Sequence, residues 1–439
     1  MNSKLLIASA FLLMIFANSI YAQDWPQFMG PNRDNTSPQK GIMRSWHESG
    51  PEVLWTVDIG IGYGGPVVKE GKVYLLDRDD KVGDNLRCFD LTTGKELWNY
   101  AYEAPGAVMF PGSRSVPVVD DAHVYSCGPY GHLYCFDIAT HKPVWNKNVW
   151  ADFGGKEIPT WAISQGPFLY NNMLIIASQA PEAGVVAYNK LTGEIIWKTP
   201  SLGEVGYVSP TLVKIDGNDH VVMITASNRS GDVKGNVVGL NPLTGKMLWN
   251  YNNWNCRIPV PAAIDAGDNK LLIIGGYELG ATMLKVEMLS DGNYAAKELF
   301  TTEEFGDQTK SAIMHNAFFY AQYGTNQKRD GMVCMSMNGE IMWKTKRDPD
   351  FNKGSMILAD GLILATDGSK MLYLIEPDPT AFKPIAKAEI LGSKASDNEI
   401  SIATRVVGGA TQNWAPIALA DGKLLIRNQS RLMCVKVAE

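Results

Sequence analysis

The chain contains few of the residues that build metal centres or reactive nucleophiles. It has six cysteines and six histidines among 439 residues, and it contains no Cys-x-x-Cys, no His-Glu-x-x-His and no Gly-x-Ser-x-Gly. These spacings are typical of zinc sites and of the nucleophile elbow of hydrolases. The acidic stretch 77–84 lacks the ligand offsets of an EF-hand, and we expect it to be a solvated hairpin loop. The sequence therefore predicts no metal site.

Positive charge and long apolar runs are also scarce. The formal net charge is −6 and the pI is about 5.6, so nothing indicates a general attraction to nucleic acid or to an anionic membrane. One apolar run, Leu5 to Phe16, follows Lys4 and precedes Ser19-Ile20-Tyr21-Ala22. This pattern predicts a signal peptide over residues 1–22, cleaved before Gln23, and no transmembrane segment. We expect a periplasmic or secreted protein, without a cysteine after the signal peptide to carry a lipid anchor.

The cysteines do not form an evident disulfide framework. Four of them hold a similar register in different parts of a repeat, so we expect them in separate cores: Cys88, Cys135, Cys334 and Cys434. Residues held apart in this way cannot pair. A single bridge between Cys127 and Cys256 is an open alternative to two buried free thiols.

What the sequence has in abundance is one repeated phrase. It reads Phe89-Asp-Leu-Thr-Thr-Gly-Lys-Glu-Leu-Trp98, and its copies end at Trp145, Trp197, Trp249 and, in shortened form, Trp343. The first four tryptophans are 47, 52 and 52 residues apart, and the larger gap before Trp343 holds a degenerate unit that ends near Phe300. A repeat of this period indicates a solenoid or a propeller.

Each unit reads as four short strands separated by tight turns. Eight opening strands can be counted, near Pro66, Pro117, Pro167, Pro210, Pro261, Ile313, Met356 and Pro416. Four-stranded units repeated in this way close into a ring. We therefore predict an all-β fold, an eight-bladed β-propeller over residues 53–439, preceded by an N-terminal arm over residues 23–52. The strand near Trp55 has no blade of its own and is expected to complete the last one.

The residue types of the repeat explain its turn. An Asp or Asn at the end of a strand bonds the backbone of the turn, Gly supplies a positive φ, and Trp buries a large area against the neighbouring unit. We assign this structural docking role to Asp90, Gly94, Trp98, Asp137, Trp145, Gly193, Trp197, Gly245, Trp249 and Trp343.

The phrase also resembles the tryptophan-docking motif of the quinoprotein-dehydrogenase-like propeller superfamily, over nearly the whole chain from Trp55. The N-terminal stretch from Asp24 to Asp34 is similar to the opening of secreted bacterial PQQ-like β-propeller repeat proteins. The resemblance implies the fold, but the superfamily holds PQQ-dependent dehydrogenases as well as cofactor-free binding proteins. The chain lacks the post-signal cysteine of the related barrel-assembly lipoprotein.

Irregular segments that lead from each outer strand to the next inner strand should meet at the mouth of the channel. They are rich in planar and cationic side chains, and we predict a ligand site formed by Arg114, Trp161, Tyr207, Arg257, Lys310 and Trp414. Arg suits planar anions, while Trp and Tyr suit sugars or aromatic rings. The alternative is that the aromatic side chains plug the channel and the cations bond blade carbonyls.

Three functions follow from these observations. The first is a non-catalytic binding or scaffold protein, expected to be a monomer, with a protein or carbohydrate ligand at the channel mouth. The second is a dehydrogenase of alcohols or sugars, in which PQQ would bind to Arg114, Arg257 and Lys310 together with a calcium ion. The chain lacks the adjacent Cys-Cys pair of many alcohol-oxidising members of the superfamily. It also lacks a haem-binding Cys-x-x-Cys-His. The third is a polysaccharide lyase or hydrolase, for which no carboxylate pair is evident in the mouth segments.

Overall fold

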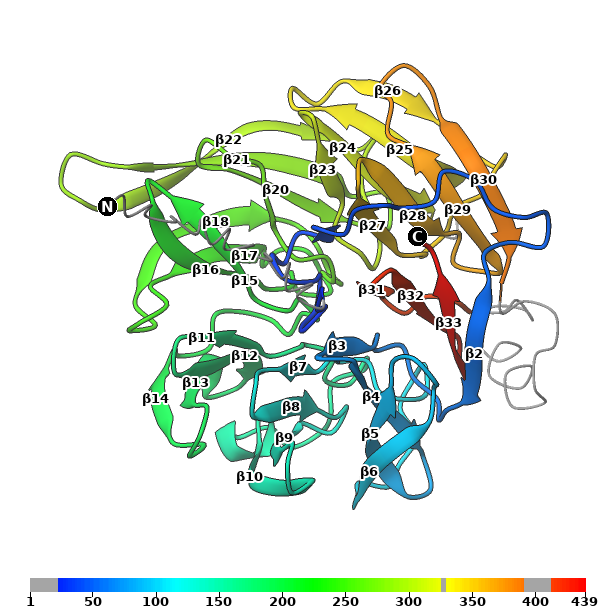
Figure 1. Ribbon diagram of the computed structural model, residues 1–439. Helices are drawn as coiled ribbons and strands as arrows, with labels where there is room; N and C mark the ends of the chain where they lie inside the picture. Colours follow the sequence, from blue (N-terminus) through cyan, green and yellow to red (C-terminus); the bar gives the residue numbers. More distant parts are fainter. Residues whose placement is uncertain (1–22, 325–328, 391–411) are drawn as a thin grey trace, which may run out of the picture.

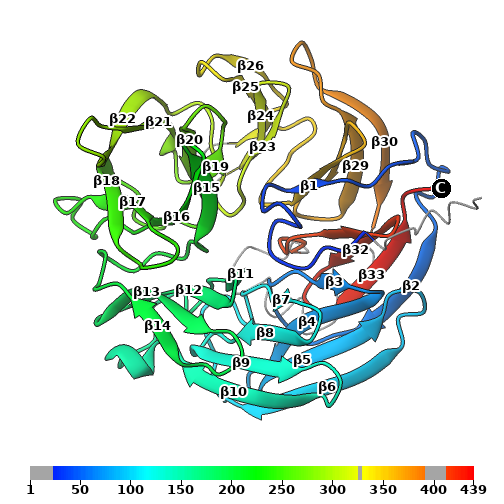
Figure 2. The ribbon, with the colours of Figure 1, turned by 60° about the vertical axis from the view of Figure 1, so that its left-hand side comes forward.

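The protein is a ring of eight antiparallel β-sheets, in agreement with the predicted eight-bladed propeller (Figures 1 and 2). The structure is a computed structural model and describes residues 23–324, 329–390 and 412–439. Within these residues, seven sheets have four strands and one has five. The predicted signal peptide over residues 1–22 lies outside the described residues.

The first four blades follow one another along the chain. Blade 1 consists of β3 (Val67–Lys69), β4 (Lys72–Asp79), β5 (Gly83–Asp90) and β6 (Glu96–Glu103). Blade 2 consists of β7 (Val118–Val119), β8 (His123–Cys127), β9 (His132–Asp137) and β10 (Lys142–Asn148). Blade 3 consists of β11 (Phe168–Tyr170), β12 (Met173–Ala180), β13 (Ala183–Asn189) and β14 (Ile195–Lys198). Blade 4 consists of β15 (Thr211–Ile215), β16 (Asn218–Ile224), β17 (Gly235–Leu240) and β18 (Met247–Trp254). A short 3₁₀ helix, η1 (Ala151–Phe153), follows blade 2.

The other four blades complete the ring. Blade 5 consists of β19 (Ile264–Asp265), β20 (Lys270–Gly275), β21 (Gly280–Met288) and β22 (Tyr294–Thr302). Blade 6 consists of β23 (Ile313–His315), β24 (Phe318–Gly324), β25 (Arg329–Ser336) and β26 (Ile341–Lys344). Blade 7 consists of β27 (Met356–Ala359), β28 (Leu362–Thr366), β29 (Met371–Glu376) and β30 (Lys383–Glu389), with β1 (Thr36–Ser37) added in parallel to β27. Blade 8 consists of β31 (Ala418–Ala420), β32 (Lys423–Arg427), β33 (Arg431–Lys436) and β2 (Val53–Asp58).

The ring is closed as the sequence predicted. Strand β2 pairs antiparallel with β33, which places Trp55 opposite Cys434. The first strand of the propeller therefore supplies the outer strand of the last blade, so that this blade also has four strands. The adjacent β2 and β33 are visible in Figure 1 as the bright-blue and red strands.

Tryptophans of one blade dock on the turn of the next. The indole N–H of Trp55 donates to the carbonyl of Leu91 at 2.9 Å, and a Cβ placed on Gly94 would lie 2.6 Å from the Trp55 ring. The turn itself is held by Asp90, whose Oδ1 accepts the N–H of Thr93 at 2.8 Å. Only glycine satisfies both the close approach and the φ of +70° at position 94.

The same contact recurs around the ring with local variation. Trp145, Trp197 and Trp343 donate to the carbonyls of Lys190, Pro242 and Asp378 respectively. In the degenerate unit of blade 5, Phe300 takes the docking place against Gly339. Two assigned residues differ in detail. Trp98 stacks on His141, with ring centroids 4.9 Å apart, and Trp249 donates to His220 Nδ1 of its own blade at 2.9 Å.

The N-terminal arm binds the inner ends of several blades. Trp25 exchanges two backbone hydrogen bonds with Val68, and Arg33 donates to the carbonyl of Leu169 at 2.8 Å while its guanidinium lies over Phe168. Further along, β1 pairs with β27, and Asp360 accepts the N–H groups of Gly41 and Ile42. The dark-blue arm can be followed across the ring in Figures 1 and 2. One arm thus links blades 1, 3 and 7.

The six cysteines are all buried and free. Cys127 and Cys256 lie in different hydrophobic clusters, so the disulfide left open by the sequence is not formed. Burial raises the pKa of the Cys127 thiol well above its usual value. Each thiol therefore packs as a small apolar group.

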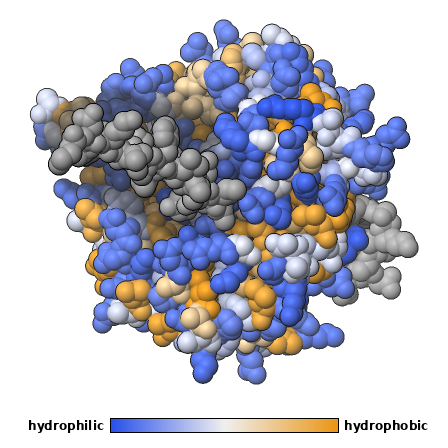
Figure 3. Space-filling model, in the orientation of Figure 1, coloured by the Kyte–Doolittle hydropathy of each residue, from blue (hydrophilic) through white to orange (hydrophobic). Residues whose placement is uncertain are grey.

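The described surface is polar with apolar side chains dispersed over it. The face in Figure 3 shows hydrophilic residues in blue with smaller apolar areas among them. Among the described residues, no helix has the length and apolar character needed to cross a bilayer.

Candidate functional site

A cavity with a volume of about 360 Å³ lies where the segments between blades converge. Its lining includes five of the residues predicted for the ligand site: Arg114, Trp161, Tyr207, Lys310 and Trp414. The structure thus brings together five of the six residues of the predicted site.

Arg257 is the sixth, and it does not line the cavity. Its side chain is exposed; burial raises the pKa of the nearby Tyr277, and Arg257 is the smallest of the causes that oppose this shift. Tyr277 itself does line the cavity and accepts a hydrogen bond from Gln308 at 2.7 Å. Arg257 therefore belongs to the surroundings of the mouth and not to its wall.

Phe28 of the N-terminal arm also reaches the cavity. The arm bonds to the turns that follow the first strand of several blades, including the N–H of Glu70 at 2.8 Å from Asp24 Oδ1. Each mouth segment leads into the start of the first strand of a blade, whereas the arm bonds to the turn at the end of that strand. The arm and the mouth therefore lie at opposite ends of the channel. Phe28 consequently contributes to the cavity from the end opposite the mouth.

Aromatic rings form one continuous wall. Tyr63 stacks on Trp414, with ring centroids 5.7 Å apart and planes inclined by 26°. Phe110 bridges this pair to Trp161, with centroid distances of 6.1 Å to Trp414 and 5.6 Å to Trp161. Such a surface offers π faces and edges to a planar ligand.

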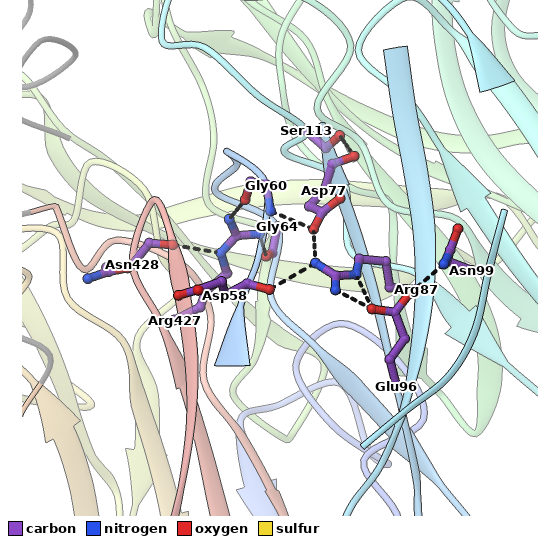
Figure 4. Close-up of polar contacts among 10 residues, drawn as sticks. All are labelled: Asp58, Gly60, Gly64, Asp77, Arg87, Glu96, Asn99, Ser113, Arg427 and Asn428. Atoms are coloured by element: carbon purple, nitrogen blue, oxygen red, sulfur yellow. Dashed lines mark hydrogen bonds and ion pairs between the residues drawn. The ribbon is translucent and has the colours of Figure 1, made fainter. Parts of the chain in front are cut away.

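The segment that carries Tyr63 is fixed by a charged network at the junction of blades 8 and 1 (Figure 4). Arg427, which is completely buried, donates to the carbonyl of Gly60 at 2.9 Å. The N–H of Gly60 in turn donates to Asp77 Oδ2 at 2.7 Å, and Arg87 lies 3.3 Å from the same oxygen. The backbone before Tyr63 is therefore held from both sides.

This network corrects part of the prediction for the acidic stretch 77–84. The stretch is a hairpin with an exposed turn around Lys81, as predicted, but it is not solvated throughout, because Asp77 and Asp84 lie in β4 and β5 and are 2% and 0% exposed. Arg78, which is also buried, lies 3.2 Å from Asp84 Oδ1. Burial raises the pKa of both carboxyls, and the arginines oppose this shift. Charge composition alone did not reveal that arginines from neighbouring strands would compensate these aspartates.

Three cations line the cavity: Arg114, Lys310 and Lys353. Arg114 donates through Nη2 to the carbonyls of Met109 and Phe110, whereas its Nη1 is buried and has no protein hydrogen-bond partner. Burial lowers the pKa of this guanidinium to about 10, so it remains charged at neutral pH. An uncompensated guanidinium N–H in a cavity is suited to an anion.

Lys310 and Lys353 stand beside Trp414. Lys310 Nζ donates to the carbonyl of Trp414 at 2.7 Å, and Lys353 Nζ lies 4.8 Å from the centroid of the Trp414 ring. The carboxylate nearest in sequence, Asp307, is fully buried and accepts the N–H groups of Thr309 and Lys310 at 2.8 and 2.9 Å. Burial lowers the pKa of Lys310 to about 8, against the opposing attraction of Asp307, and raises that of Asp307 to about 6.

Four aromatic or cationic residues that line the cavity lie outside the segments considered in the sequence: Phe28, Tyr63, Tyr277 and Lys353. Two of them had a usable signal, because Tyr63 and Lys353 lie in the segments that precede blades 1 and 7. Those segments occupy the same place in the repeat as the mouth segments that carry Arg114, Trp161 and Trp414. Phe28 and Tyr277 come from the arm and from the β20–β21 turn, to which that rule does not apply.

Comparison with known proteins agrees with the fold. The sequence profile of the family described as outer membrane protein assembly factor BamB matches residues 82–283. The protein has the fold of the PQQ-like β-propellers. This confirms the resemblance seen in the repeated phrase. No curated protein sequence gives a significant match to the chain.

Solved structures similar to this propeller include both enzymes and an assembly factor. Quinohemoprotein alcohol dehydrogenase from Comamonas testosteroni is 13% identical, with a TM-score of 0.65, over 96% of this chain and 82% of that chain. BamB from Moraxella catarrhalis is 12% identical, with a TM-score of 0.57, over 88% of this chain and 97% of that chain. A europium-containing methanol dehydrogenase is 13% identical, with a TM-score of 0.59, over 92% and 89%. Identities this low show a shared fold and leave the activity open.

A quinone cofactor with a metal ion does not fit the described cavity. The three cations suit the carboxylates of PQQ, but no Asp or Glu is among the described residues that line the cavity. Calcium requires several oxygen ligands, usually including carboxylates. Across the described residues, no group of three or more His, Cys, Asp or Glu side chains is arranged to hold a metal ion. The donor set therefore favours an anion without an accompanying metal.

Proposed function

We propose that the protein is an extracytoplasmic, non-catalytic binding protein whose channel mouth takes a planar anionic ligand. The observation that carries the proposal is the guanidinium of Arg114, which lines a cavity walled by Tyr63, Trp161 and Trp414 and whose buried Nη1 has no protein hydrogen-bond partner. The predicted signal peptide supports the location. The ligand rests its ring on the aromatic wall and its negative group on the guanidinium.

The volume of the cavity limits the size of the ligand. About 360 Å³ lies near the lower end of the range for small-molecule sites, which is about 300–1,000 Å³. With Phe28 at the far end, the cavity suits one or two rings and not a polymer threaded through the channel. If the ligand is a protein or a carbohydrate, as predicted from the sequence, it would place a planar anionic group, either terminal or on a side chain, in the cavity.

The second candidate is the PQQ- and calcium-dependent dehydrogenase. The similarity to quinohemoprotein alcohol dehydrogenase supports its fold, but the described cavity offers no carboxylate for the metal or for proton abstraction. A polysaccharide lyase or hydrolase requires an acid and a base, and the same absence disfavours it.

Equilibrium titration distinguishes these functions. The purified protein is titrated with terephthalate, with its neutral diamide, and with PQQ in the presence of calcium or of a chelator, while tryptophan fluorescence is followed. The proposal predicts saturable binding of the aromatic anions, little binding of the diamide, and no effect of calcium. Binding of PQQ that requires calcium would favour the dehydrogenase instead. Equal affinity for the diamide and the dianion would contradict the anion site.

A further inference from the structure

Lys310 differs from the other cations of the cavity because it is a primary amine bonded to uncharged acceptors. Its Nζ donates to the carbonyl of Trp414 at 2.7 Å and lies 3.3 Å from the hydroxyl of Thr309. Within the described residues no carboxylate pairs with it, since Asp307 is engaged by backbone N–H groups. The amine is therefore held at the cavity wall without a carboxylate bonded directly to it, although Asp307 nearby still favours its protonated form.

A second cation acts on the same amine. Burial is the main cause that disfavours the charged form of Lys310; Asp307 opposes it, and Lys353, which is only 6% exposed, adds a smaller effect in the same direction as burial. Together these lower the pKa of Lys310 to about 8, so about a tenth of the side chain is uncharged at pH 7. A lysine that is desolvated and placed next to another cation is activated as a nucleophile.

The neighbouring wall would place a ring beside this amine. Trp414 accepts the Lys310 hydrogen bond through its backbone and stacks on Tyr63 through its indole. A ligand ring that rests on this wall has its substituents close to Nζ. Arg114 remains to bind a negative substituent of the same ligand.

We propose that Lys310 captures an aldehyde group of an anionic aromatic ligand as a reversible imine. The uncharged amine adds to the carbonyl carbon, a C–N bond forms, and a proton moves from nitrogen to the former carbonyl oxygen. The resulting carbinolamine loses the hydroxyl as water and gives the C=N bond. One water molecule is released for each imine, and no oxidant or reductant takes part. The inference rests on the proposed function, since it names a chemical class of ligand for the same cavity.

Trapping with borohydride tests this inference. The protein is incubated with 4-carboxybenzaldehyde at low concentration and treated with sodium borohydride, which reduces the imine to a stable secondary amine. We expect one adduct per chain, located at Lys310 by peptide mass mapping, and competition by terephthalate. In Lys310→Arg, which keeps the charge but removes the primary amine, trapping at this site is lost and total labelling falls at least tenfold. Arg257→Gln, which changes an exposed cation outside the cavity, retains the adduct at Lys310.

Separate outcomes identify which proposal fails. Circular dichroism and the thermal midpoint establish that the variants are folded, and terephthalate binding is measured without borohydride. If terephthalate binds but labelling is spread over surface lysines equally in the wild type and in Lys310→Arg, the imine is overturned and the anion site stands. If neither terephthalate nor the aldehyde binds, the proposed function itself is overturned and the imine with it.

Discussion

Lys310 Nζ donates a hydrogen bond of 2.7 Å to the backbone carbonyl of Trp414, 104 residues further along the chain. The bond joins the segment that precedes blade 6 to the segment that precedes blade 8. It also connects the cationic and aromatic parts of one cavity, because both residues line it.

Replacing Arg114 removes the principal anion donor. We expect Arg114→Gln to weaken terephthalate binding by about 10- to 100-fold, which corresponds to the loss of a charged hydrogen bond of about 1.5–3 kcal/mol. Arg257→Gln is the matched control, since Arg257 is exposed and does not line the cavity. Calorimetric titration of both variants measures the effect. Equal loss in the two variants would mean that general charge, and not the cavity, attracts the ligand.

Anion affinity should fall as the pH rises through about 8. Burial lowers the pKa of Lys310 to about 8, so its positive charge is present below this pH and is lost above it. We expect terephthalate to bind several-fold more weakly at pH 9 than at pH 7, with a flatter profile in Lys310→Arg. An affinity that stays constant over this range in the wild type would contradict the role of Lys310.

The lowered pKa of Lys310 also makes the free energy of unfolding increase with pH, whereas the anion affinity decreases with pH. The unfolded chain keeps the Lys310 proton up to its usual pKa of 10.5, whereas the folded protein loses it near 8. The cost of burying this charge is therefore fully present below pH 8 and is relieved as the pH rises towards 10.5. Lys310→Met should gain stability relative to the wild type at pH 7 and lose that advantage at higher pH. Chemical denaturation at several pH values measures the difference.

Two glycines with the same backbone conformation separate docking from local strain. Gly94 and Gly71 have φ of +70° and +71°, but a Cβ meets the Trp55 ring at 2.6 Å only at position 94. We expect Gly71→Ala to cost about 1 kcal/mol, from the left-handed conformation alone. Gly94→Ala should cost about 2–4 kcal/mol, because the indole must also move. Similar thermal midpoints for the two variants would show that the contact between Trp55 and Gly94 contributes little to the stability of the fold.

The arm should depend on Arg33. Its guanidinium donates to Leu169 and lies 4.6 Å from the centroid of the Phe168 ring, whereas Arg44 forms an exposed ion pair with Asp360. We expect Arg33→Met to lower the free energy of unfolding by about 2 kcal/mol and Arg44→Met by no more than about 0.5 kcal/mol. Denaturant unfolding of both variants checks this ranking. A larger effect at Arg44 would contradict the described anchoring of the arm.

The repeat made much of the fold predictable. The Asp-x-x-Thr-Gly turn and its tryptophan depend on local hydrogen bonds and on one contact with the next blade, so they leave a pattern that survives from Trp98 to Trp343. Ring closure by the strand at Trp55 followed from counting strands, and the pairing with Cys434 confirms it.

The cavity was predictable only where its residues share one place in the repeat. Trp161 and Trp414 precede opening strands and could be found by that rule, whereas Phe28 enters from the arm. The burial of Asp77 had no signal of this kind, because its partners Arg87 and Gly60 come from a neighbouring strand and from the junction with blade 8. Such compensation depends on tertiary contacts and not on local composition.

A crystal structure of the protein with terephthalate, grown in the presence of a chelator, tests the central claim most directly. The account predicts density for the ligand in the mouth cavity, with one carboxylate within hydrogen-bond distance of Arg114 Nη1 and the ring against the wall formed by Tyr63 and Trp414. Density for the ligand only at the outer surface, or a guanidinium of Arg114 that remains without the anion at saturating ligand, would contradict it.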